Sequence, residues 1–84
     1  MNDTVQILYV DDEPINLMLF KVNFQDSFTI HTTDSGESGL QILRHHPEIK
    51  AVISDMKMPG MNGVEFIATA KAEFPDLSCF ILTG

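Results

Sequence analysis

Runs of apolar residues alternate with amphipathic segments along the whole chain. Four short runs rich in Val, Ile, Leu and Phe predict strands, at residues 5–10, 28–33, 50–54 and 77–83. The segments between them carry apolar residues at helical spacing, which predicts helices over 14–25, from residue 34 to just before Pro47, and from 62 to 74. This βαβαβαβ order with short loops predicts an α/β fold in which helices cover both faces of a parallel sheet.

The first predicted helix is apolar on more than one side. Leu17, Phe20 and Phe24 fall at i, i+3 and i+7 and predict a stripe that faces the core. Four further apolar residues widen this surface: Ile15, Met18, Leu19 and Val22. One interpretation is a broadly buried helix. The other is that Met18 and Val22 lie outside and form part of a docking face.

Short polar residues predict where the second and third helices begin. Asp34 can cap the second helix with Glu37 reaching back, and Asn62 can cap the third with Glu65 nearby. Two sets of apolar residues are then expected to face the core: Leu40 and Leu43 in the second helix, and Val64, Ile67 and Ala70 in the third.

The histidines are expected to be ordinary surface residues. Residues 28–33 alternate between apolar and polar, which predicts a strand near a sheet edge with His31 pointing to solvent. His45 and His46 end the second helix, where cations suit the helix dipole. As sequence neighbours these two point in different directions, so we do not expect them to form a metal site.

Composition limits the class of protein. The chain has 84 residues, enough for one small domain, and its 44% hydrophobic content argues against disorder. A net charge of −7 argues against direct nucleic-acid binding. We see no membrane-spanning run and no signal peptide, and the single Cys79 is expected to be a reduced core residue. These features lead us to expect a cytoplasmic domain.

Acidic residues follow the predicted strands at their carboxyl ends, where open parallel sheets place their working sites. Asp11 and Asp12 follow the first strand, Asp55 follows the third and Thr83 ends the fourth. If the first and third strands are neighbours, three carboxylates converge and need a cation to offset their repulsion. Such hard oxygen ligands suit Mg²⁺, beside which a carboxylate can attack phosphorus. The alternative is a set of helix caps and solvated acids.

Three motifs in this order resemble the receiver domain of two-component response regulators. They read VDDEP at residues 10–14, DMKMPGMNG at 55–63 and ILTG at 81–84. The resemblance extends over the whole chain. It implies a flavodoxin-like, doubly wound parallel sheet, with strand order 2-1-3-4-5 in complete members.

The resemblance also implies roles for particular residues. Asp55 would accept a phosphoryl group from a histidine kinase or a phosphotransfer protein. Asp11 and Asp12, with Asp55 and the main-chain carbonyl of Lys57, would hold Mg²⁺. Thr83 would be the hydroxyl that moves to contact the phosphoryl oxygens. The chain would then be a phosphoacceptor rather than an enzyme, possessing at most self-catalysed phosphotransfer and dephosphorylation, and a longer chain could add an output domain.

One departure from the family pattern is large. Receivers continue after the switch hydroxyl through a helix, a fifth strand that carries an aromatic switch residue beside a lysine, and a final helix; none of these can be assigned here. We therefore expect residues 1–84 to form a receiver domain that is incomplete at its C-terminus. The fourth strand would be an exposed apolar edge, which favours a homodimer or a swapped oligomer.

Two other functions fit parts of the pattern. A pseudo-receiver would keep the fold and dimerise, but it would not change its state in response to phosphorylation. The missing lysine favours this alternative. A metal-dependent phosphatase with an aspartyl nucleophile places two acids two residues apart after its first strand. Asp11-Asp12-Glu13 does not follow that pattern with a following Thr.

Overall fold

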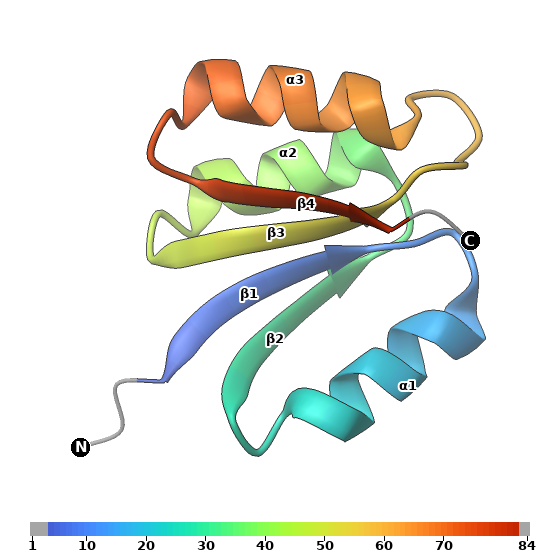
Figure 1. The fold of residues 1–84 in the computed structure, drawn as a ribbon, viewed down its shortest axis with the longest axis vertical. Helices are drawn as coiled ribbons and strands as arrows, with labels where there is room; N and C mark the ends of the chain where they lie inside the picture. Colours follow the sequence, from blue (N-terminus) through green and yellow to red (C-terminus); the bar gives the residue numbers. More distant parts are fainter. Residues whose placement is uncertain (1–3, 83–84) are drawn as a thin grey trace.

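A parallel four-stranded sheet with helices on both faces forms the molecule, as a computed structural model describes it for residues 4–82 (Figure 1). The strands lie in the order β2-β1-β3-β4. Their bounds, with those of the helices, are β1 Val5–Val10, α1 Pro14–Phe24, β2 Phe28–Thr33, α2 Gly36–His45, β3 Ile49–Asp55, α3 Gly63–Glu73 and β4 Ser78–Leu82. The predicted flavodoxin-like α/β fold and its βαβαβαβ order are confirmed.

The central position of β1 explains its nearly continuous apolar sequence. It pairs with β2 on one side and β3 on the other, so that Leu8 lies between His31 and Val52. Leu8, Val10 and Val52 are completely buried. A strand covered on both faces cannot alternate between apolar and polar residues, whereas the edge strand β2 does.

The main core fills the space between the sheet and the helices α2 and α3. Leu40 and Leu43 of α2 are buried there, as predicted. In α3 the prediction was partly wrong: Phe66 and Ala70 are buried, whereas Val64 is 51% exposed. Phe66 and Ala70 are four residues apart and share one helix face, and Phe66 was not among the expected core residues.

The helix α1 covers the opposite face of the sheet, over β1 and β2 (Figure 1). None of its residues is buried, so the prediction of a broadly buried helix is wrong. Leu17 and Phe20 are half-buried, and the Phe20 ring stacks on Tyr9 with ring centroids 4.2 Å apart. Phe24, the third residue of the predicted stripe, is 43% exposed.

The outer surface of α1 carries a second apolar stripe, which faces solvent. Its residues are at i, i+3, i+4 and i+7: Ile15, Met18, Leu19 and Val22. Periodicity alone predicted that these side chains share a side of the helix, but it could not show that nothing among residues 4–82 packs on them. The position of Met18 and Val22 therefore fits the second interpretation of this helix, and their docking role stays a prediction.

The two capping predictions had different outcomes. Asn62 and Glu65 form a reciprocal capping box at the start of α3, with Asn62 Oδ1 accepting from Glu65 N at 2.9 Å. At α2, Asp34 is not the cap. Ser35 takes that place, and its Oγ accepts from the Ser38 N–H at 3.2 Å. The cap is thus one residue later than predicted. The extended backbone of Ser35 places its hydroxyl over the first turn of α2.

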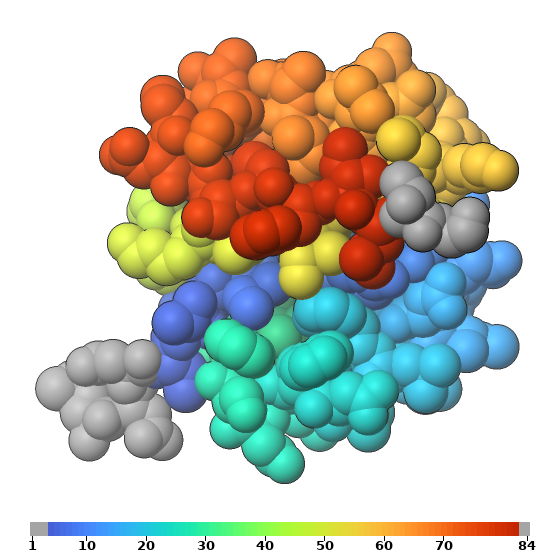
Figure 2. All heavy atoms as spheres, in the orientation of Figure 1, coloured from blue at the N-terminus to red at the C-terminus, as the bar shows by residue number. Residues whose placement is uncertain are grey.

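At the edge of the sheet, β4 alternates between the core and the surface. Cys79 is a half-buried free thiol that packs against the main core, and burial raises its pKa. Phe80 and Leu82 point to the other face and are 55% and 48% exposed. Figure 2 shows β4, in red, reaching the surface between α3 and α1. Within residues 4–82 no helix has the length and apolar character needed to span a bilayer.

His31 is less exposed than predicted, because His46 at the end of α2 packs over it. The two rings lie 4.8 Å apart, and His31 Nε2 is 2.8 Å from Gln6 Oε1. Burial, and next the neighbouring His46, lower the pKa of His31. The negative charge of Glu48, which interacts with His46 Nδ1 at 3.2 Å, raises the pKa of His31, and the positive charge of Lys21 lowers it further.

From the lowered pKa of His31 we expect the folded chain to lose stability in weak acid. The unfolded chain binds a proton at His31 near the ordinary histidine pKa of about 6.5, while the folded chain resists it, so the free energy of unfolding falls as pH is lowered through that value. The fall levels off below the pKa of His31 in the folded chain. Urea denaturation between about pH 7.5 and 5 measures it.

The variant His31→Gln, which keeps a polar partner for Gln6, should show a smaller fall over the same range. Glu48 and Glu73 do not confuse the comparison. Their pKa values are lowered, Glu48 mainly by a backbone hydrogen bond and Glu73 mainly by Arg44, so their contributions disappear only in stronger acid. An identical pH slope in the variant and the wild type would contradict the assignment to His31.

Candidate functional site

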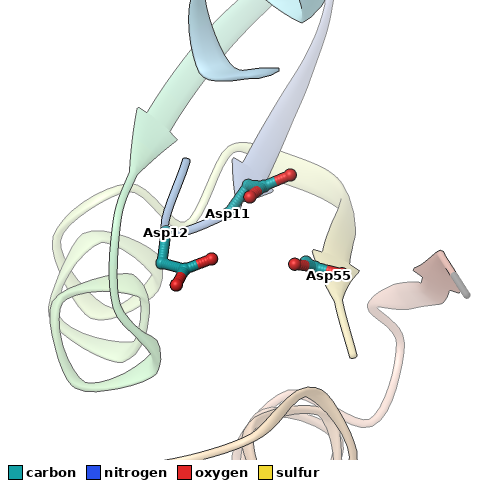
Figure 3. A group of neighbouring side chains, drawn as sticks. All are labelled: Asp11, Asp12 and Asp55. Atoms are coloured by element: carbon teal, nitrogen blue, oxygen red, sulfur yellow. The ribbon is translucent and has the colours of Figure 1, made fainter. Parts of the chain in front are cut away.

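Three aspartates meet at the carboxyl ends of β1 and β3. Asp11 and Asp12 follow β1 directly, and Asp55 is the last residue of β3. The two strands are paired neighbours, with Val10 opposite Ser54, so their ends reach the same rim of the sheet. Each aspartate offers an oxygen atom, and these atoms all lie within 4.8 Å of one another (Figure 3). The predicted convergence of the acids is confirmed.

Asp11 is the buried member and is fixed by hydrogen bonds. Its side chain is surrounded so completely that the residue is only 3% exposed. Tyr9 Oη donates to Oδ2 at 2.7 Å, Asn16 Nδ2 donates to the same oxygen at 3.1 Å, and the Glu13 backbone N–H donates to Oδ1 at 3.0 Å. A buried carboxylate needs such donors to be tolerated. These three bonds hold the carboxylate in one orientation at the rim.

Sequence reasoning missed Tyr9 and Asn16 as supports of the site. Tyr9 precedes Asp11 by two residues on β1, so the period of a strand could have placed both side chains on one face. Burial, then the hydrogen bond to Asp11, then the negative charges of Asp11 and Asp55 raise the pKa of Tyr9 above its usual value. The phenol therefore stays protonated at neutral pH and remains a donor to Asp11.

Asp12 and Asp55 are more accessible than Asp11. Asp55 is half-buried, and Asp12 lines an open hollow of about 490 Å³ beside the acids. The rest of that hollow is formed by the loop after β3, through Met56, Lys57, Met58, Pro59 and Asn62. Solvent or a phosphorylated group can therefore approach the acids from this side. The role of the Lys57 carbonyl as a metal ligand stays a prediction.

The loop after β3 is tied to the strand by Gly63, the first residue of α3. The Gly63 N–H donates to the Met56 carbonyl at 2.9 Å. A Cβ atom at Gly63 would collide with the backbone carbonyl oxygen of Asp55. Only a glycine lets α3 start this close to the end of β3. Another glycine in the loop, Gly60, has a φ of 76°, which side chains rarely tolerate.

Thr83 lies outside the described residues, so its proposed switch role stays a prediction. Its neighbour Leu82 is described, and the Leu82 carbonyl accepts from the Met56 N–H at 3.2 Å. The end of β4 is therefore hydrogen-bonded to the residue that follows Asp55.

The residues of the site fit a hard divalent cation. Three carboxylates this close repel one another strongly unless positive charge joins them. Mg²⁺ prefers oxygen ligands, keeps several waters, and is commonly bound through a few carboxylates in an open site. Within residues 4–82, the acid trio is also the one group of three or more side chains with suitable ligand atoms this close together.

Comparison with known proteins identifies the family. A model of the response regulator receiver domain matches residues 7–84. The chain belongs to this family. Receiver domains are generally phosphoacceptor signalling modules rather than enzymes, bind Mg²⁺ at an acidic pocket, interact with histidine kinases and are often joined to output domains.

Individual receivers agree with this assignment. A response regulator receiver domain from Clostridium thermocellum has 34% sequence identity and a TM-score of 0.91, over 95% of this chain and 65% of that one. The response regulator TrrA from Thermotoga maritima, solved in complex with Mg²⁺ and BeF, has 32% identity and a TM-score of 0.89, over 95% of this chain and 70% of that one. The transcriptional regulatory protein GlrR of Escherichia coli is 32% identical over 79 residues, which are 93% of this chain and 18% of that protein. This receiver chain thus spans less than a fifth of that curated relative.

The contact at Gly63 predicts a large effect of one added methyl group. Gly63→Ala places Cβ against the Asp55 backbone, which cannot turn aside as a side chain can, so we expect the free energy of unfolding to fall by about 3 kcal/mol. Chemical denaturation followed by circular dichroism measures this.

Gly36→Ala is the matched control, because Gly36 is also the first residue of a helix. Its Cβ would first meet the flexible end of Met61, which can move, and next the Cβ of buried Phe66 at 3.2 Å, which has to shift by only a few tenths of an ångström. The loss should therefore be clearly smaller than for Gly63→Ala, at about 1 kcal/mol. Equal losses in the two variants would show that the Asp55 carbonyl does not determine the need for glycine.

Proposed function

We propose that this chain is the phosphoacceptor part of a two-component response regulator, phosphorylated on Asp55 by a histidine kinase or a phosphotransfer protein. The observation that carries the proposal is the convergence of Asp11, Asp12 and Asp55 within 4.8 Å at the rim of the sheet. The family assignment gives this acid trio its chemical meaning.

Asp55 is better suited than Asp11 to act as the nucleophile. The carboxylate of Asp11 is buried and already accepts three hydrogen bonds. The Asp55 carboxylate accepts no hydrogen bond from residues 4–82 and is half-buried beside an open hollow, so its lone pairs stay available for phosphorus. Between Asp55 and Asp12, the family motif at residues 55–63 favours Asp55.

The transfer forms one bond and breaks another. A carboxylate oxygen of Asp55 bonds to phosphorus while the P–N bond of a phosphohistidine breaks, and the released imidazole nitrogen keeps the electron pair and takes up a proton. Mg²⁺, held by Asp11, Asp12, Asp55 and the Lys57 carbonyl, would offset the charge of the acids and of the phosphoryl oxygens. The product at Asp55 is an acyl phosphate.

The protein partner needs a surface near the acids, and α1 supplies one. This helix begins at Pro14, two residues after Asp12, and its exposed stripe starts at Ile15. A helical partner that presents phosphohistidine to Asp55 could bury this stripe. We therefore assign the outer side of α1 to contact with the kinase or phosphotransfer protein.

A pseudo-receiver is the second candidate. It is favoured because no lysine or arginine within residues 4–82 forms an ion pair with the acid trio. Lys57 lines the hollow beside Asp12 without forming an ion pair with the trio. Lys71 Nζ donates to the Leu77 carbonyl before β4, and Lys50 lines a different cavity, formed by residues from the ends of α2 and α3. Three carboxylates with one Mg²⁺ remain net negative, and a phosphoryl group adds more negative charge. A chain without a further cation would bind Mg²⁺ but hold phosphate poorly.

A small phosphodonor tests Asp55 directly. With acetyl phosphate and Mg²⁺, the wild type should gain the mass of one phosphoryl group in intact-mass spectrometry, and Asp55→Asn should gain none, because its amide is not a nucleophile. Asp76→Asn removes the same charge at an exposed position outside the site and should react as the wild type does. A wild type that gains no phosphoryl group would favour the pseudo-receiver hypothesis. Equal modification of Asp55→Asn would refute the assignment of Asp55 as the phosphoacceptor.

Binding of Mg²⁺ tests the acid cluster separately from phosphorylation. In isothermal titration calorimetry the wild type should bind one Mg²⁺, and Asp12→Ala should weaken binding at least about tenfold, roughly 1.4 kcal/mol, because an accessible ligand is lost. Asp76→Ala is the control with the same change in charge. No binding by the wild type, or equal weakening in both variants, would contradict a specific site.

A further inference from the structure

The buried carboxylate of Asp11 is held by groups that belong to α1 or pack on it. The Glu13 N–H, which donates to Oδ1 at 3.0 Å, is at the N-cap of this helix. Asn16, which donates to Oδ2 at 3.1 Å, lies in its first turn. Tyr9, which donates to Oδ2 at 2.7 Å, comes from β1, but its ring stacks on Phe20 of α1. In the part of the chain that the structure describes, the orientation of Asp11 therefore depends on where α1 lies.

Tyr9 is the more closely packed of the two side chains that donate to Asp11. The residue is only 4% exposed, and its ring lies nearly parallel to that of Phe20, with an angle of 12° between the two planes. Asn16, by contrast, is exposed. The stack on Phe20 restricts the ring of Tyr9, and with it the direction in which the hydroxyl points. A side chain that packing holds in this way is a precise support for a metal ligand.

The two carboxylate oxygens of Asp11 differ in the acceptor capacity that is left to them. An ionised carboxylate has about four acceptor sites, two on each oxygen. Oδ2 accepts from both Tyr9 and Asn16, whereas Oδ1 accepts from the Glu13 N–H. Oδ1 is therefore the oxygen of Asp11 that keeps an acceptor site for a cation.

We propose that Tyr9 is a positioning residue of the metal site: its hydroxyl turns Asp11 so that Oδ1 faces the cation, and its ring ties that orientation to α1. This inference rests on the proposed function, because it concerns the same Mg²⁺. Metal ligands are commonly oriented by such outer partners, whose loss typically lowers metal affinity about 10- to 100-fold. A shift of α1 then changes the affinity of the acids for Mg²⁺. By reciprocity, a protein bound to α1 and Mg²⁺ bound to the acids change each other's affinity by the same factor.

Calorimetry with Mg²⁺ separates this role from simple packing. Tyr9→Phe keeps the ring and its stack but loses the hydroxyl, so the dissociation constant for Mg²⁺ should rise about tenfold. Phe20→Leu removes the stack and leaves the hydroxyl, and should raise the constant about threefold. Phe24→Leu is the matched control on the same helix, because the ring of Phe24 contacts that of Phe20, with centroids 4.8 Å apart, one turn further from the acids. It should leave Mg²⁺ binding unchanged, and circular dichroism verifies that all three variants fold.

The fluorescence of Tyr9 gives a second measurement, which needs no variant. The chain has one tyrosine and no tryptophan, so light absorbed beyond the range of phenylalanine is emitted from this site. A phenol that donates to a carboxylate emits weakly, because the acceptor attracts its proton in the excited state. Once Asp11 shares its charge with Mg²⁺ it is a weaker acceptor, so the emission should rise with the same dissociation constant that calorimetry gives. In Asp12→Ala the rise should need at least about ten times more Mg²⁺, as binding does.

Phosphorylation by acetyl phosphate shows whether Tyr9 acts through the metal. Because Asp55 is unchanged, Tyr9→Phe should reach the wild-type rate at saturating Mg²⁺ but need about ten times more Mg²⁺ for half of that rate. A lower rate at saturating Mg²⁺ would place the effect of Tyr9 on Asp55 instead and would overturn the proposal.

The outcomes distinguish this role from the proposed function. A wild type that binds no Mg²⁺ would refute both. If it binds Mg²⁺ but gains no phosphoryl group, the phosphoacceptor function fails, and calorimetry still decides the role of Tyr9. Equal Mg²⁺ affinity of Tyr9→Phe and the wild type, an unchanged tyrosine emission, or an equally large effect of Phe24→Leu would refute the positioning role alone.

Discussion

Repulsion among three carboxylates is the constraint on which the rest of this structure depends. Two parallel strands that end side by side bring Asp11, Asp12 and Asp55 to one place, and the fold holds them there instead of letting them separate. Burial alone would push such groups toward neutrality or apart. Tyr9 and Asn16 supply Asp11 with the hydrogen-bond donors that a buried carboxylate needs. The remaining negative charge suits the site to a cation with oxygen ligands.

The same constraint explains the close contacts behind the acids. Asp55 can stay at the rim only if the chain turns immediately, and the approach of Gly63 to the Asp55 carbonyl makes that turn possible. The capping box of Asn62 and Glu65 then starts α3 at once. The loop between them lines the hollow beside the acids. The rim is therefore closely packed at Gly63 and open on the side of the hollow, which suits a site where a group arrives from another protein.

Much of this was predictable from sequence, for reasons that differ between residues. The meeting of Asp11 with Asp55 follows from topology, because neighbouring parallel strands end at one rim. The cap of α2 was misassigned because Asp34 and Ser35 both suit that role, and the backbone angles of the turn decide between them. The bonds from Tyr9 and Asn16 to Asp11 depend on side-chain geometry that a pattern of residue types does not contain. The exposure of α1 depends on which elements are present to cover it, which periodicity cannot reveal.

The two faces of the sheet differ in how much apolar surface they expose. The face under α2 and α3 contains the closed core, whereas the face under α1 exposes the outer stripe of the helix and, at the other edge, Phe80 and Leu82. Both exposed regions connect to the rim within a few residues. Asp12 leads directly into α1, and the Met56 N–H beside Asp55 bonds to the Leu82 carbonyl. Gly63, the first residue of α3, also lies against the Asp55 carbonyl and bonds to Met56, so the closed core touches the same rim. Asp55 is thus connected both to the elements that carry exposed apolar surface and to the helix that packs on the core.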